Sequence, residues 1–266
     1  MPKSLIHCIT NPISMNQCAN TILALGAKPI MAEHPLEVEE ITDTADALLL
    51  NLGNISDTRM EAMRLSLHVA KERGIPVVID AVGVACSKLR RSFLYELIDI
   101  GGVTLIKGNY AEILAVYDEG YRARGVDSEE TMAPSDMEDV ALSLSTRLKA
   151  IILATGRTDV VAAFGSAEQI TGGCEQMSAL TGTGCMLGAL LATLLTKDRS
   201  IIAVAEGVRF FDECGSKAAT KKGIGTYMTR LLDALGGYIE YDYIFSESVL
   251  HFGQHGSVDR RVLAKD

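Results

Sequence analysis

The order of apolar and polar positions along the chain predicts strands that alternate with amphipathic helices. Continuous apolar runs occur at 47–51 (ALLLN), 76–80 (PVVID), 103–106 (VTLI) and 150–154 (AIILA). Between them, residues 59–73 and 93–100 repeat apolar side chains at helical spacing. Continuous apolar runs are typical of strands that are buried on both faces. The pattern therefore predicts an α/β fold, with a mainly parallel central sheet flanked by helices on both faces.

Polar residues and glycine gather at the carboxyl end of each apolar run. They occur at 51–53 (NLG), 80–83 (DAVG), 107–109 (KGN) and 155–156 (TG). Ligands of open α/β sheets bind outside the carboxyl ends of the strands. Any one of these stretches alone is typical of an ordinary turn, but strands in register would bring them all to one edge. The sequence therefore predicts a ligand site at that edge.

A glycine-rich turn at 181–185 (TGTGC) precedes an apolar stretch, 186–195, that predicts a helix. Gly182 and Gly184 let the backbone approach a ligand, and a helix start presents unpaired N–H groups and a positive dipole end. Such a turn suits a phosphate or a developing anion. The dipole should also lower the pKa of Cys185 and make it the most reactive of the six cysteines. The alternative is an ordinary helix start with a small buried cysteine.

Two acidic residues and a lysine at the strand ends are candidates for binding a metal ion and a phosphate. Asp80 ends its strand, while Asn109 and Glu112 have the spacing of a helix capping box. If Glu112 also faces the site, it can help Asp80 to hold Mg²⁺ through water, because magnesium keeps several waters and takes only one or two carboxylates. Lys107 is a point charge suited to a phosphate, although a lone lysine is more often only solvated.

Composition narrows the class of protein. The net charge of −9 argues against general nucleic-acid binding, which needs a basic surface. Residues 176–196 carry no charge, but their threonines and glycines favour a buried turn and core helix over a membrane span. The cysteines have irregular spacing without C-x-x-C, so we expect neither a disulfide framework nor a zinc site. We therefore expect a protein with reduced cysteines in the cytoplasm. We expect one domain over residues 1–266, with 118–136 as a surface excursion.

Other motifs give negative or weaker signals. The chain has neither the GxxxxGK[ST] nor the GxGxxG nucleotide motif. His251 and His255 have the spacing of zinc ligands on a helix, but Gly253 weakens that helix and no third ligand is nearby, so we expect no metal there. Residues 223–226 (GIGT) precede an amphipathic helix at 227–235. They are either a second anion-facing turn or a helix entry that Thr226 caps.

Several motifs together resemble those of hydroxyethylthiazole kinases. They are 7–11 (HCITN), Asn16 with 19–20 (AN), 23–32 (LALGAKPIMA), 50–53 (LNLG), 79–83 (IDAVG), 106–109 (IKGN) with Glu112, 154–156 (ATG) with 159–160 (DV), 180–185 (LTGTGC) and 223–225 (GIG). The opening stretch and the TGTGC turn are specific when they occur together. The resemblance covers nearly the whole chain apart from 118–136 and the tail.

The resemblance implies a ribokinase-like fold, usually a homotrimer with sites near subunit contacts. It implies Mg²⁺-dependent transfer of the γ-phosphate of ATP to the alcohol of 4-methyl-5-(2-hydroxyethyl)thiazole, in thiamine salvage. By motif position it implies that the thiazole is bound by Asn11, Ile13, Met31 and Gly182, the ATP phosphates by Lys107 and Thr155, and Mg²⁺ by Asp80 and Glu112. Cys185 stands where the wider ribokinase-like group has an aspartate base.

The chain departs from the usual family motifs at Ala81, where proline is usual, at Lys107, where arginine is usual, and at Thr183, where alanine is frequent. A lysine cannot bind a phosphate through two parallel hydrogen bonds as arginine does, so Lys107 should weaken the affinity for ATP. None of these departures removes a chemical group from the site.

Three other functions remain open from the residues. A kinase for a hydroxymethylpyrimidine or a sugar would share the fold, although the opening around Asn11 and Met31 argues against it. A non-catalytic sensor of a vitamin precursor or nucleotide is disfavoured because Asp80, Glu112 and Cys185 are all present. A hydrolase with Cys185 as nucleophile would need a histidine partner, which the sequence does not place nearby.

Overall fold

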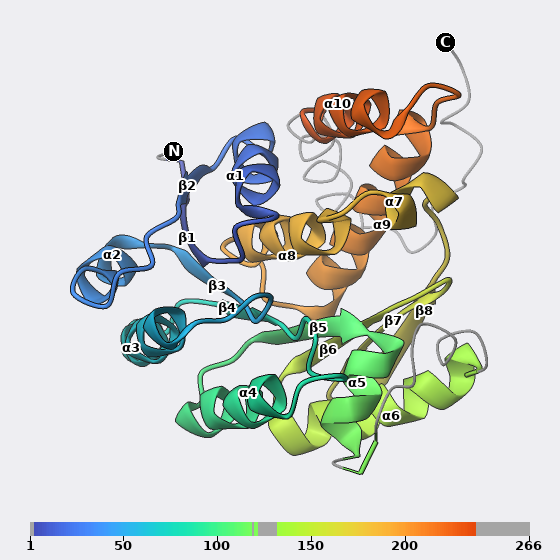
Figure 1. The fold of residues 1–266 in the computed structure, drawn as a ribbon. Helices are drawn as coiled ribbons and strands as arrows, with labels where there is room; N and C mark the ends of the chain where they lie inside the picture. The colour runs from blue at the N-terminus through green and yellow to red at the C-terminus, as the bar shows by residue number, and fades with distance from the viewer. Residues whose placement is uncertain (1–2, 119, 122–131, 238–266) are drawn as a thin grey trace, which may run out of the picture.

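A computed structural model describes residues 3–118, 120–121 and 132–237. Within this part of the chain, one eight-stranded sheet has the order β2-β1-β3-β4-β5-β6-β7-β8 (Figure 1). The strands are β1 (Leu5–Ile9), β2 (Lys28–Ile30), β3 (Ala47–Asn51), β4 (Val77–Asp80), β5 (Leu105–Asn109), β6 (Ile151–Thr155), β7 (Asp159–Ala163) and β8 (Ser166–Ile170). The pairs from β2 to β6 are parallel, and β7 and β8 add an antiparallel edge. The predicted mainly parallel sheet is confirmed.

Helices cover both faces of the sheet (Figure 1). One face carries α1 (Met15–Ala24), α8 (Thr183–Leu194), α9 (Ile201–Ala218) and α10 (Ile224–Leu235). The other carries α3 (Asp57–Arg73), α4 (Lys88–Ile100), α5 (Tyr110–Tyr117) and α6 (Pro134–Leu148). The short helices are α2 (Val38–Thr44) and α7 (Glu175–Ala179).

Strand β3 shows why the apolar runs are continuous. Leu49 belongs to the core beneath α1, α8, α9 and α10, while Leu48 and Leu50 belong to the core beneath α3 to α6. All residues of β3 are buried, because successive side chains enter opposite cores. The sheet therefore separates two apolar cores, and the predicted arrangement of layers is confirmed.

Some predicted elements have different ends in the structure. Helix α4 begins at Lys88 rather than at 93, because the Ser87 hydroxyl accepts a hydrogen bond from the Arg90 N–H (3.3 Å) and caps the helix. Strand β5 continues to Asn109 rather than ending at 106, which places Lys107 inside the sheet. Much of the 118–136 stretch, for which we predicted a surface excursion, lies outside the described residues.

The uncharged stretch around 176–196 contains α8, which is buried for most of its length. It packs on β3, β4 and α9, as a core helix does. Among the described helices, none has both the length and the apolar character needed to cross a membrane.

The register of the strands brings their polar ends together. Asn51 of β3 pairs with Asp80 of β4, and Asp80 pairs with Lys107 of β5. On the other side of β5, Asn109 pairs with Thr155 of β6. The prediction that these strand ends meet at one edge of the sheet is confirmed.

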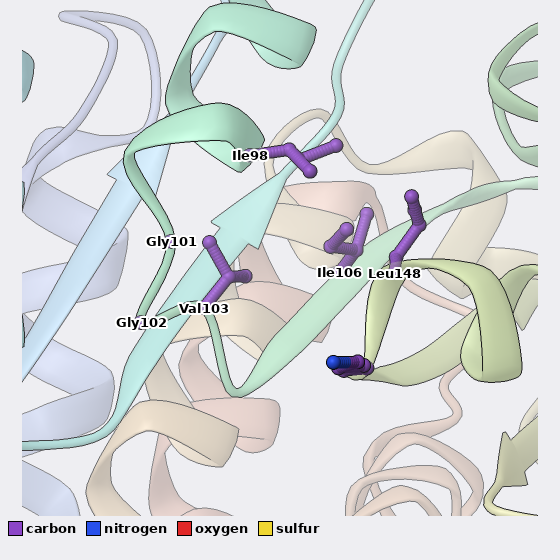
Figure 2. A pocket seen from close by; sticks show the side chains of 7 residues that line it. Ile98, Gly101, Gly102, Val103, Ile106 and Leu148 are labelled. Atoms are coloured by element: carbon purple, nitrogen blue, oxygen red, sulfur yellow. The ribbon is translucent and has the colours of Figure 1, made fainter.

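A cavity of about 420 Å³ lies near the other end of β5 (Figure 2). It is lined by Ile98, Gly101, Gly102, Val103, Ile106, Leu148 and Lys149. None of the site residues predicted from the sequence lines this cavity. The polar strand ends, rather than this cavity, are therefore the candidate site.

Candidate active site

The candidate site contains a buried ion pair. Lys107 Nζ lies 3.1 Å from Asp80 Oδ1, and neither side chain is more than 4 % exposed. Burial raises the pKa of Asp80, although attraction to Lys107 partly opposes this. Burial would lower the pKa of Lys107, but the attractions of Asp80, Cys185 and Glu112, together with the hydrogen bond to Asp80, outweigh it and raise that pKa. Lys107 therefore stays charged in the interior, with Asp80 as its partner.

Cys185, in the first turn of α8, lies near this ion pair. Gly182 precedes the helix with φ +96°, a left-handed conformation that favours glycine, and no side chain caps the helix start. Gly184 is so close to the ion pair that an added Cβ would lie 3.5 Å from Lys107 Nζ. The uncapped first turn of α8 therefore lies close to a buried cation, an arrangement that suits a phosphate.

Two side-chain amides hold the Cys185 sulfur. Asn51 Nδ2 donates to Sγ at 3.2 Å and Asn11 Nδ2 donates at 3.6 Å. Asn51 Nδ2 also donates to Asp80 Oδ2 at 3.0 Å. The structure thus joins the glycine turn, the strand ends and Asn11 into one connected cluster.

The predicted lowering of the Cys185 pKa is wrong. Burial raises this pKa above its usual value, and the Asp80 carboxylate raises it further. Ser14, Lys107 and the amide of Asn51 act in the opposite direction without outweighing them. The start of α8 carries only a partial positive charge, which would lower the pKa of Cys185. Asp80 carries a full negative charge nearby and raises it.

Glu112 forms the predicted capping box and also joins two loops. Its Oε2 accepts from the Asn109 N–H (2.8 Å), and its own N–H donates to Asn109 Oδ1 (2.8 Å). Its Oε1 accepts from the Gly83 N–H (2.7 Å), in the loop after β4. Gly108 permits this approach, because an added Cβ would lie 2.9 Å from the Glu112 Cβ. Glu112 therefore ties the loop that follows Asp80 to the start of α5.

The donor set around Asp80 and Glu112 fits a magnesium ion bound through water. Burial raises the pKa of Glu112, and the nearby Asp80 raises it further, so the two carboxylates repel one another. A divalent cation would relieve that repulsion, and oxygen ligands are the ones that Mg²⁺ takes. In the described ranges, no group of three or more His, Cys, Asp or Glu side chains could hold a metal ion by itself.

The predicted thiazole residues are only partly gathered. Asn11 is buried, and its Oδ1 accepts from the Ser14 N–H at 3.1 Å. Gly182 lies beside the start of α1, where an added Cβ would be 3.3 Å from the Ser14 Cβ. Ile13 is 64 % exposed just before α1, and Met31 is half-buried against the core beneath α1 and α8.

Thr155 ends β6 on the other side of Lys107. Its hydroxyl donates to the Gly108 carbonyl at 3.3 Å. Nearby, Asp159 Oδ1 accepts from the Gly156 N–H at 2.8 Å, and burial raises the pKa of Asp159 to about 7. Thr155 thus lies next to β5, one strand away from Lys107.

Two remaining sequence motifs have different outcomes. Helix α10 begins after Gly223 without a side-chain cap, so the interpretation of Thr226 as its cap is wrong. His251 and His255 lie outside the described residues. Asn51 is the residue that the sequence analysis missed, because it was noted only as part of a turn.

Comparison with known proteins gives concordant matches. A family model described as "Hydroxyethylthiazole kinase family" matches residues 2–240. Hydroxyethylthiazole kinase 1 of Clostridium botulinum (strain Loch Maree / Type A3) is 41% identical over 236 residues, covering 87% of this chain and 89% of the relative. The solved hydroxyethylthiazole kinase protein from Pyrococcus horikoshii OT3 has a TM-score of 0.79 at 30% identity, covering 88% of each chain. A ribokinase-like superfamily protein from Enterococcus faecalis V583 has a TM-score of 0.64 at 14% identity, covering 89% of this chain and 86% of its own, which confirms the expected ribokinase-like fold.

Proposed function

The chain belongs to the hydroxyethylthiazole kinase family, and from this premise we propose that it transfers the γ-phosphoryl group of ATP to the alcohol of 4-methyl-5-(2-hydroxyethyl)thiazole in thiamine salvage. One observation carries the proposal. The uncapped start of α8 and the half-buried Cys185 meet the buried Asp80–Lys107 pair in one cluster at the strand ends. These are the groups that a phosphoryl transfer to an alcohol needs in one place.

Phosphoryl transfer depends on positioning and on neutralising charge rather than on covalent steps by the protein. The N–H groups of Gly184 and Cys185 are proposed to hold the oxygens of the transferring group, since they begin a helix that lacks a side-chain cap. Lys107 and Thr155 are proposed to contact the phosphates of ATP. The alcohol oxygen bonds to the γ-phosphorus as the bond from that phosphorus to the oxygen of ADP breaks.

Cys185 is proposed to act on the alcohol proton. Its sulfur accepts hydrogen bonds from Asn51 and Asn11, an arrangement that stabilises a negatively charged sulfur. In the thiolate form Sγ takes the proton that the alcohol loses. Since an alcohol is far less acidic than a thiol, this transfer comes late, and before it Cys185 orients the hydroxyl.

Asp80 and Glu112 are proposed to hold Mg²⁺ through bound water. When bound, the ion neutralises negative charge on the triphosphate. Asp80 then has two cations to pair with, Lys107 and the metal ion. Glu112 keeps the loop after β4 in place through its bond to the Gly83 N–H.

The function is tested by ATP turnover against a panel of thiazole, pyrimidine and sugar alcohols. The highest kcat/KM should be with hydroxyethylthiazole. A preference for a hydroxymethylpyrimidine or a sugar would replace the proposed substrate with another small alcohol. Tight binding of thiazole without turnover of any alcohol would favour a sensor instead.

We also propose that the protein is a cytoplasmic homotrimer. Ile13, just before α1, is 64 % exposed, and Leu23, on α1, is 55 % exposed, which is a high exposure for large apolar side chains. Sedimentation of the purified chain should give the mass of a trimer, and replacing both residues by serine should shift it toward the monomer. A monomeric wild-type chain would contradict the proposal.

Lys107 is predicted to serve the nucleotide rather than the thiazole. Lys107→Ala should raise the KM for ATP with little change in the KM for the alcohol, because a phosphate loses its cation. Steady-state kinetics with each substrate varied in turn measures both constants.

The matched variant Lys107→Arg keeps a partner for Asp80 and can bind a phosphate through two hydrogen bonds, so it should lower the KM for ATP. It therefore separates loss of the phosphate contact from disruption of the buried ion pair. If the KM for the alcohol changes instead, the two ligands are reversed.

A further inference from the structure

Asn51 is the junction between the proposed metal site and the proposed base. It ends β3 and has no exposed surface. Its Nδ2 donates one hydrogen bond to Asp80 Oδ2 (3.0 Å) and one to Cys185 Sγ (3.2 Å). Its Oδ1 accepts from Asn11 Nδ2 (3.1 Å) and from the Gly53 N–H (2.9 Å).

This pattern uses the full hydrogen-bonding capacity of an amide. The two hydrogens of Nδ2 face two acceptors, and the oxygen faces two N–H donors. A reversed amide would face its NH₂ group toward the two donors and its oxygen toward a carboxylate. Since leaving buried polar groups unpaired is costly, the four partners fix one orientation of Asn51.

The orientation has a consequence for Cys185. The first turn of α8 and the end of β4 come from distant parts of the chain, and Asn51 bonds to a side chain from each. The second sulfur contact, from Asn11, is longer at 3.6 Å, and Asn11 is itself bonded to Asn51 Oδ1. The shorter of the two amide contacts to the sulfur and the amide contact to Asp80 therefore come from the same side chain, Asn51.

We propose that Asn51 is a positioning residue that fixes the Cys185 sulfur relative to Asp80, so that the sulfur faces the acceptor alcohol while the metal and phosphates lie beside Asp80. The role of Asn51 in turnover rests on the proposed kinase function. The competing explanation is that Asn51 only satisfies buried polar groups at the end of β3. The two explanations differ in whether the effect of Asn51 passes through Cys185.

A double-mutant cycle separates them. Asn51→Ala should lower kcat about 10- to 100-fold, the range found for groups that orient metal ligands, with the KM for ATP little changed. In a Cys185→Ala background, the same substitution should cost only a few-fold, because the sulfur that Asn51 positions is gone. An equal loss in both backgrounds would overturn the proposal. If Asn51→Ala does not fold, Asn51→Ser takes its place in the cycle.

A second measurement needs no kinase activity, so it separates failure of this proposal from failure of the proposed function. The isosteric Asn51→Asp replaces a donor to the sulfur by a carboxylate oxygen, which should slow alkylation of Cys185 by iodoacetamide at least about 10-fold at fixed pH. Asn54→Asp, the same substitution at an exposed position in the turn that follows β3, should leave alkylation and kcat unchanged. Peptide mass spectrometry measures the rate of Cys185 alkylation. An unchanged rate in Asn51→Asp would show that the amide does not hold the sulfur and would overturn the proposal.

Discussion

Asp80→Asn or Glu112→Gln should reduce kcat by about 10²-fold or more, because each removes a carboxylate that is proposed to hold Mg²⁺ near the transferring phosphoryl group. The effect should appear in kcat measured over a range of Mg²⁺ concentrations at saturating ATP. Raising the Mg²⁺ concentration should recover part of the activity of each single variant, since a weakened metal site can still be filled by mass action.

The two variants differ in their effect on stability. Asp80→Asn leaves the buried Lys107 without its carboxylate, and breaking a buried pair in this way costs about 3–5 kcal/mol. Thermal unfolding should therefore be measured beside kcat, and activity compared at a temperature where both proteins are folded. Asp99→Asn, at an exposed position of α4, is the control for removing one acidic charge. Normal turnover in the Asp80→Asn, Glu112→Gln double variant would remove the metal assignment.

Loss of the Cys185 side chain should cost about 10²- to 10⁴-fold in kcat, the usual contribution of a general base. Cys185→Ser should keep some activity, because a hydroxyl can orient the alcohol although it is a poor base. Cys185→Asp should remain active, because a carboxylate can accept the same proton. Steady-state kcat of the three variants, each relative to the wild type, is the measurement.

A covalent role for Cys185 makes opposite predictions. A nucleophilic cysteine would leave Cys185→Asp inactive, and intact-mass spectrometry during turnover would detect an adduct on the enzyme. Such an adduct would contradict the proposed role as a base and would favour the hydrolase alternative.

The raised pKa of Cys185 also changes the expectation that it is the most reactive of the cysteines. Cys86 is the exposed thiol among the described residues and should be alkylated before Cys185.

The sequence predicted the parts of the site that depend on short-range pattern. The capping box of Asn109 and Glu112 and the glycine turn before Cys185 follow from residue spacing along the chain, and both are present. The gathering of Asp80 and Lys107 followed from a general rule of parallel sheets, in which the carboxyl ends of strands share one edge.

What the sequence could not predict depends on contacts between distant residues. The sign of the Cys185 pKa shift is set by burial and by Asp80, which is far away in the chain. The role of Asn51 was missed because its partners come from β4, from α8 and from the residues before α1. An asparagine after an apolar run has many ordinary uses, and only its four partners distinguish this one.

The buried pairing of Lys107 with Asp80 has a consequence for the order in which ligands arrive. In the structure the two opposite charges satisfy one another, so Lys107 has little free charge to offer a lone phosphate. A magnesium–nucleotide complex carries both opposite charges together, and it can give Asp80 a cation at the same moment as it gives Lys107 an anion. The Asp80–Lys107 pair is thus self-neutralised, and an exchange of counter-ions favours the complete metal–nucleotide complex over a phosphate without its metal ion.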